Sequence, residues 1–158
     1  MNMKNITGIM AAAAAAVLLS ACGKEGTAGG GVGSSAGSPL GSWHMESWTA
    51  MTAADIYVAF DDDGTFDLYQ RLYTPYYEHL DGTWEYSRGV LGGEYSDGEP
   101  WRSEYRLSFS NEGGNMTMTA VSDAADAARY VKADIPDSII SGDLSMKSYG
   151  GDPGFRAL

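Results

Sequence analysis

Apolar and polar residues alternate with a period of two along much of this chain, in short runs separated by turn residues. Ile56, Val58 and Phe60 alternate with Tyr57 and Ala59, and similar runs cover 66–69, 104–109 and 116–119. This alternation is typical of antiparallel strands that bury one face. Between the runs we expect turns at Asp63-Gly64, Asp81-Gly82, Gly92-Gly93, Asp97-Gly98 and Gly113-Gly114. The predicted strands are 41–48, 55–60, 65–73, 82–87, 90–95, 101–109, 115–121 and 128–133.

Eight short strands at regular spacing predict an all-β domain, either a barrel or a sandwich. We favour an eight-stranded antiparallel up-and-down β-barrel, because closure removes exposed strand edges. The domain is expected to span residues 40–136, enough for one hydrophobic core. The predicted core residues are Trp43, Phe60, Phe66, Trp84, Leu107 and Met118. Residues 137–158 are expected to form an irregular tail that packs against the barrel near Ile139.

The first 22 residues have the three parts of a secretory signal. Lys4 gives a positive charge, residues 6–19 are almost wholly apolar, and Leu19-Ser20-Ala21-Cys22 follows. This apolar stretch is too short for a transmembrane helix, which needs roughly 20 residues. Residues 1–21 are therefore predicted to be a signal peptide. Residues 22–39 follow as a Gly- and Ser-rich linker, which cannot bury enough apolar surface to fold.

The sequence Leu19-Ser20-Ala21-Cys22 resembles the lipobox of bacterial lipoproteins, where one aliphatic and two small residues precede a cysteine. The resemblance implies that Cys22 is lipidated and becomes the first residue of the mature chain. Cys22 is the only cysteine, and lipidation agrees with the rarity of lone free thiols in oxidising compartments. The alternative is an ordinary secretory signal with an incidental cysteine.

Short motifs within the predicted barrel resemble those of lipocalin-like domains. They include Leu40-Gly41-Ser42-Trp43, Asp63-Gly64-Thr65-Phe66 and Gly82-Thr83-Trp84-Glu85-Tyr86. In this order, and behind a lipobox, they resemble the small lipocalin-like domains of lipoproteins from Bacteroides and relatives. The resemblance covers residues 40–136 and implies a barrel anchored to the outer membrane, facing the periplasm or exposed at the cell surface. It implies no particular activity, because this family has no common one.

The charge balance limits the kinds of partner. The chain has 21 Asp and Glu against 10 Lys and Arg, a formal net charge of −11. Such an excess of acid disfavours binding to nucleic acid or to anionic lipid head groups. The expected contact with a membrane is therefore the lipid on Cys22.

No catalytic or metal motif stands out. An EF-hand loop starting at Asp61 would need Gly and Glu where Phe66 and Leu72 stand. His44 and His79 have no metal-ligand spacing, and no nucleophile or phosphate-binding motif occurs. We therefore expect no enzyme, no metal and no cofactor, although two carboxylates could still converge across strands.

The most distinctive chemistry is aromatic and surrounds Pro75, from the third predicted strand to the segment before the fourth. Tyr69, Tyr73, Tyr76 and Tyr77 lie there close to Arg71. Tyrosine-rich loops suit recognition, because each ring offers apolar area and a hydroxyl. We hypothesise a binding lipoprotein that holds a small apolar or amphipathic ligand, or a glycan, at the barrel mouth. The alternatives are that these rings cover the barrel, or that a filled barrel contacts an envelope or host protein.

Overall fold

The computed structural model describes residues 37–142 and 154–158. The predicted signal peptide, Cys22, most of the linker and residues 143–153 of the tail lie outside this part. The described strands are β1 (Gly41–Trp48), β2 (Ala54–Phe60), β3 (Thr65–Leu72), β4 (Glu78–Ser87), β5 (Val90–Tyr95), β6 (Tyr105–Ser110), β7 (Asn115–Ala120) and β8 (Ala127–Lys132). A 3-10 turn, η1 (Asn111–Gly113), separates β6 from β7, and a short helix, α1 (Asp137–Ile140), follows β8.

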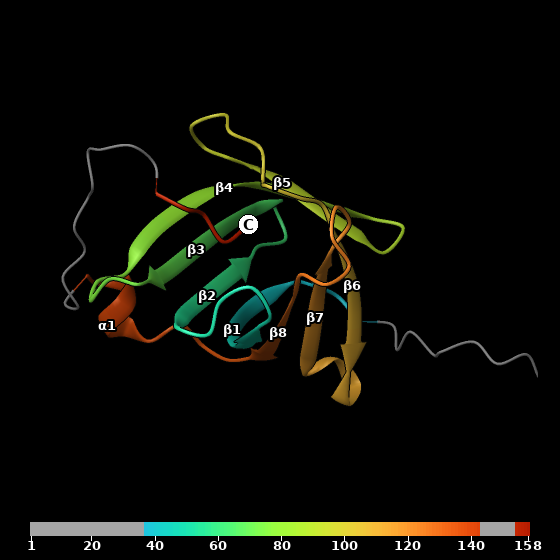
Figure 1. Cartoon of the computed structure of the whole chain (residues 1–158), viewed down its shortest axis with the longest axis horizontal. Coiled ribbons are helices and arrows are strands. Elements are labelled where there is room, and N and C mark those ends of the chain that lie inside the picture. The colour runs from blue at the N-terminus through green and yellow to red at the C-terminus, as the bar shows by residue number, and fades with distance from the viewer. Residues whose placement is uncertain (1–36, 143–153) are drawn as a thin grey trace, which may run out of the picture. The chain divides into compact units, whose positions relative to one another are not determined.

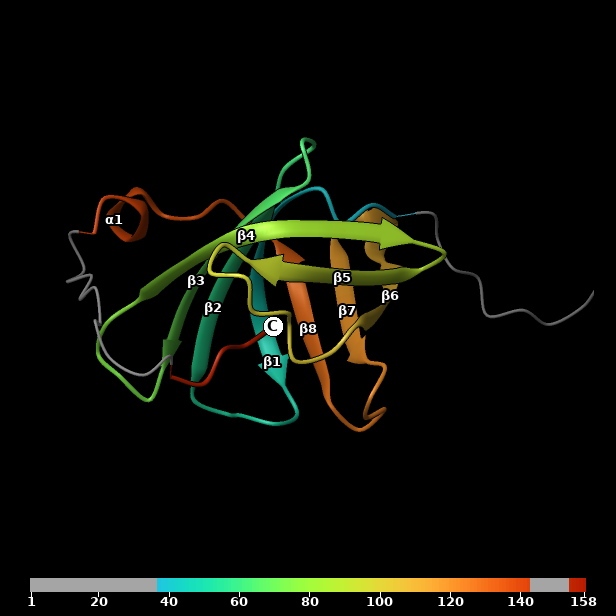
Figure 2. The ribbon, with the colours of Figure 1, turned by 90° about the horizontal axis from the view of Figure 1, so that it is seen from above.

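The strands pair in chain order, each antiparallel to the next, and β8 pairs with β1 to close the barrel. Figures 1 and 2 show this succession from β1 to β8. The predicted eight-stranded antiparallel up-and-down barrel is confirmed. Because each strand pairs with its neighbour in sequence, short turns are sufficient to connect them. In the described part of the chain, no helix is long and apolar enough to cross a membrane.

Two of the predicted turns, Asp81-Gly82 and Gly92-Gly93, lie inside strands, and the prediction of a turn at each was wrong. Gly82 is within β4, which starts at Glu78, and Gly93 is within β5. A Cβ atom on Gly82 would overlap the carbonyl oxygen of Glu94, and one on Gly93 would lie 2.6 Å from the Trp101 ring. These glycines therefore permit close approach across the sheet rather than a change of direction.

The predicted sixth strand also begins later than expected, at Tyr105 instead of residue 101. Trp101 instead lies in the 96–104 loop, where its backbone N–H donates to the carbonyl of Gly93 over 3.0 Å. Its ring is 6% exposed and packs edge-on against Phe66, with the centroids 5.1 Å apart. The loop thus adds a large aromatic side chain to the core, a favourable burial of apolar area.

The inward-facing side chains form one hydrophobic core. Among the predicted core residues, Trp43, Phe60, Phe66 and Met118 are at most 1% exposed, and Trp84 and Leu107 are partly buried against them. Trp43 lies near the start of β1, where its indole N–H donates to the carbonyl of Pro39 over 2.6 Å. Pro39 is itself buried, so the packed domain starts before Leu40. Lys132 of β8 lies over the Trp43 ring, 4.9 Å from its centroid.

The tail is more ordered than expected where it is described. Residues 137–140 form α1, although no helix was predicted there. Ile139 of α1 is 3% exposed and packs in a second apolar cluster with Tyr69 and Tyr77. Packing near Ile139 was expected, whereas the helical turn that presents this side chain was not.

Candidate functional site in the barrel mouth

One end of the barrel, which we call the mouth, is formed by the ends of β1, β3, β5 and β7 and by the loops 49–53, 73–77, 96–104 and 121–126. The segment 154–158 lies in it, and Figure 2 shows this red segment reaching the C-terminal end of the chain among the strands. Ala157 and Leu158 are 5% and 2% exposed, so they belong to the hydrophobic core. This insertion was not predicted from the sequence.

Gln70 of β3 is a polar residue on the inner face, where it follows Phe66 and Leu68 at alternate positions. It is 2% exposed, and its amide pairs with the backbone of the 154–158 segment. Nε2 donates to the carbonyl of Phe155 over 3.0 Å, and Oε1 accepts from the N–H of Ala157 over 2.9 Å. Since a buried amide requires partners, the segment compensates for a polar side chain inside the barrel.

Three further side chains donate hydrogen bonds to carbonyl oxygens of the segment. The Tyr95 hydroxyl donates to Leu158 over 3.0 Å, the Tyr105 hydroxyl to Ala157 over 3.4 Å, and Arg102 Nε to Ala157 over 3.2 Å. Burial raises the pKa of Tyr95 above its usual range and that of Tyr105 to about 12. Like tyrosines of ordinary pKa, which is about 10, both hydroxyls are protonated at neutral pH and can donate.

The outer part of the segment is held by charge and by aromatic rings. Arg156 makes a two-nitrogen contact with the carboxylate of Asp97 and lies 4.4 Å from the Tyr95 ring centroid. The hydrogen bonds from Arg156 and from the backbone N–H of Glu99, together with the charge of Arg156, lower the pKa of Asp97 to about 2. Phe155 is 54% exposed and lies beside Trp48 and below the Arg102 guanidinium.

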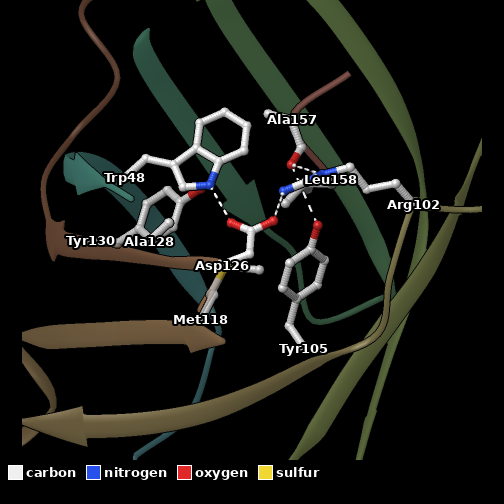
Figure 3. A pocket seen from close by; sticks show the side chains of 9 residues that line it. All are labelled: Trp48, Arg102, Tyr105, Met118, Asp126, Ala128, Tyr130, Ala157 and Leu158. Atoms are coloured by element: carbon white, nitrogen blue, oxygen red, sulfur yellow. Dashed lines mark hydrogen bonds and ion pairs between the residues drawn. The ribbon is translucent and has the colours of Figure 1, made fainter. Parts of the chain in front are cut away.

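Arg102 links the segment to the rim of the mouth. Its Nη2 donates to Asp126 over 2.7 Å, and the other oxygen of Asp126 accepts from the Trp48 indole over 2.6 Å. Figure 3 shows these groups around the remaining space, with the Tyr105 hydroxyl directed at Ala157. The cavity between them has a volume of about 10 Å³, room for roughly one water molecule. In this conformation the mouth is filled.

The tyrosines that we proposed for ligand binding do not line this cavity. Because side chains alternate along β3, Tyr69 lies on the opposite face from Gln70, where it stacks on His79. Tyr77 is 5% exposed in the cluster with Ile139, whereas Tyr73 and Tyr76 are exposed in the 73–77 loop. The structure therefore distributes the four rings between the outer face and the loop.

Arg71 and Tyr77 meet at Asp55 on this outer face. Arg71 Nη2 and the Tyr77 hydroxyl donate to the same carboxylate oxygen over 2.7 and 2.5 Å, and His44 contacts the other over 2.9 Å. Burial raises the pKa of Asp55, but these donors outweigh it and the net pKa is lowered. Both carboxylate oxygens of Asp55 therefore have partners, and the cluster links β1, β2, β3 and the 73–77 loop.

The residues that hold the segment were largely missed by sequence reasoning. One local signal was available, because Gln70 is the polar member of an otherwise apolar inward face with Phe66 and Leu68. A buried glutamine on such a face indicates a polar partner inside the barrel. Tyr95 and Asp97 gave no comparable signal.

A closed eight-stranded antiparallel barrel of this kind fits a lipocalin-like binding fold. Comparison with known proteins adds no narrower assignment: no protein-family model matches the chain, and no curated protein sequence matches it.

Replacement of Arg156 tests whether the segment is docked in solution. We expect Arg156→Ala to raise the pKa of Asp97 from about 2 toward the ordinary value near 4, as measured by NMR titration of the carboxyl carbon. The ion pair favours docking above pH ~4 and is lost as the pH falls through about 2, because the docked state has the lower pKa. An ordinary Asp97 pKa in the wild-type chain would contradict the docked arrangement. Arg129→Ala, which removes an exposed arginine elsewhere, is the control.

Proposed function

We propose that this protein is a lipid-anchored binding lipoprotein of the outer membrane, whose lipocalin-like barrel holds a small amphipathic ligand in the mouth when the 154–158 segment leaves. One observation carries the proposal: Gln70, Tyr95 and Tyr105, all buried, direct hydrogen bonds at that segment and not only at the barrel. Buried polar groups need partners. A vacated mouth would therefore present donors to a new occupant.

The surroundings of Leu158 favour an amphipathic ligand over a wholly polar one. Met118 and Ala128 supply apolar surface beside the cavity, and Tyr105 and Arg102 supply donors toward its opening. Pockets of this composition bind an apolar body and fix it through a few polar contacts. A molecule with a short hydrocarbon chain and a carbonyl or carboxylate acceptor matches both parts.

The small cavity favours a second candidate function. With room for roughly one water molecule, the barrel is filled as it stands. The second candidate is therefore a structural or protein-interaction lipoprotein of the cell envelope. In this function the barrel stays filled and binds no small ligand.

A fluorescent fatty acid distinguishes the two functions. We expect dansyl-labelled undecanoic acid to bind the full chain carrying Leu158→Ser at least about tenfold more tightly than the wild type, because the apparent affinity rises with the open fraction. Ile140→Ser is the matched control, because Ile140 is 53% exposed in α1, away from the cavity lining. If neither Leu158→Ser nor Ile140→Ser binds the labelled fatty acid, the result favours the filled-barrel function.

The lipid anchor has its own test. We expect Cys22→Ser to move the protein from the membrane fraction to the soluble fraction, because the acyl chains on Cys22 supply the membrane affinity. Ser34→Ala, also in the linker, should leave the protein in the membrane fraction. Equal membrane association of the two variants would contradict lipidation at Cys22.

A further inference from the structure

The contacts in the mouth are those that a peptide backbone requires. An amide side chain carries one donor and one acceptor group like those of a peptide unit. Gln70 uses both, on the carbonyl of Phe155 and the N–H of Ala157, which flank Arg156. A residue in a neighbouring parallel strand pairs with its partner in this same way. Gln70 therefore recognises an extended backbone.

The other mouth residues continue along the same backbone. Arg102 and Tyr105 donate to the carbonyl of Ala157, and Tyr95 donates to that of Leu158. These four receptor side chains come from β3, β5, β6 and the 96–104 loop. Hydrogen bonds to successive main-chain groups are a recurring mode of peptide recognition.

Side-chain preferences follow from the space and charge at each position. Asp97 and the Tyr95 ring select arginine at the position of Arg156. Ala157 is 5% exposed beside a cavity of about 10 Å³, which leaves room only for a small residue. The 2% exposure of Leu158 indicates an apolar residue at the last position.

We infer that the mouth is a binding site for an extended peptide of another protein with the succession arginine, small residue, leucine, and that the 154–158 segment is its built-in competitor. The inference rests on the proposed function, because both require the mouth to open. An attached segment acts at an effective concentration that reaches the millimolar range. A free peptide at micromolar concentration consequently competes poorly until the segment is weakened.

The test weakens the segment without altering the barrel. In the full chain, Arg156→Glu places a like charge beside Asp97, and Arg129→Glu makes the same charge change at an exposed arginine of β8. We expect fluorescein-labelled Gly-Phe-Arg-Ala-Leu to bind the Arg156→Glu chain at least about tenfold more tightly than the wild type or the Arg129→Glu chain, as measured by fluorescence anisotropy.

A charge exchange identifies the site and leaves the core unchanged. Asp97 is exposed, so Asp97→Arg should fold normally. Combined with Arg156→Glu it would restore the internal ion pair, so we combine it with Arg156→Ala instead. The double variant should bind Gly-Phe-Glu-Ala-Leu more tightly than Gly-Phe-Arg-Ala-Leu. The Arg156→Ala chain, which keeps Asp97, should show the opposite preference. Equal preference in the two chains would overturn the assignment of Asp97.

The remaining outcomes separate this inference from the proposed function. If the Arg156→Glu chain binds dansyl-labelled undecanoic acid but no peptide, the binding function stands and the peptide inference is wrong. If it binds neither, both are wrong. If native mass spectrometry shows wild-type dimers that the arginine peptide dissociates, the occupant is the 154–158 segment of a second copy, and the inference of a foreign peptide is wrong.

Discussion

Gly93→Ala is expected to lower the free energy of unfolding by about 2–3 kcal/mol, the cost of overpacking a well-filled core. The added Cβ would lie 2.6 Å from both the carbonyl oxygen of Thr83 and the Trp101 ring. Neither group can move easily, because Thr83 is paired within the sheet and Trp101 packs between Phe60 and Phe66. Urea unfolding measures the change.

Gly92→Ala is the matched control for this substitution, one residue earlier in the same strand. Its Cβ would meet only the Glu104 side chain, at 3.6 Å. We expect a change within about 0.5 kcal/mol, as for most substitutions that avoid a packed contact. If the two variants lost equal stability, Trp101 would not pack against β5 as described.

Leu158→Ala is expected to lower the free energy of unfolding by about 2–4 kcal/mol, the range for removal of a buried leucine side chain. Leu158 is 2% exposed and belongs to the same core cluster as Met118 and Ala128. The decrease in the free energy of unfolding cannot exceed the free energy of docking of the segment, because a segment that can leave the mouth stabilises the fold by no more than that amount. The size of the loss therefore reports how readily the mouth opens.

Phe155→Ala supplies the comparison within the same segment. Phe155 is 54% exposed and touches Trp48 and Arg102 from outside. We expect urea unfolding to show a loss of about 1 kcal/mol or less, consistent with a partly solvated aromatic pair. Similar small losses for Leu158→Ala and Phe155→Ala would mean that the segment docks weakly, which would favour an open mouth.

The barrel was predictable from sequence because the patterns that specify its strands, and the pairing of those strands, involve residues close together in the chain. Alternation of apolar residues such as Ile56, Val58 and Phe60 identifies a strand, and neighbouring strands in an up-and-down barrel pair with each other. Glycines were harder to interpret. Gly64 has a positive φ of 85° and does lie at a turn, whereas Gly82 lies inside a strand, and the flanking residues are much alike.

The tyrosines proposed for ligand binding do not share one face of the barrel, because side chains alternate along a strand. Tyr69 directly follows Leu68, so if Leu68 faces the core, Tyr69 must face outward. The cluster of tyrosines along the chain indicated a shared surface, but adjacent positions on a strand belong to opposite faces.

The sequence by itself determined the number and order of the strands and several residues of the core, because each depends on patterns within a few residues. Only the tertiary structure decided what fills the mouth. The contact between Ala157 and Gln70 joins residues 87 positions apart, and five residues without a hydrophobic period carry no signal of their partner. Such a contact arises from the space and the buried hydrogen-bonding groups that the closed barrel presents, and these exist only after the strands have come together.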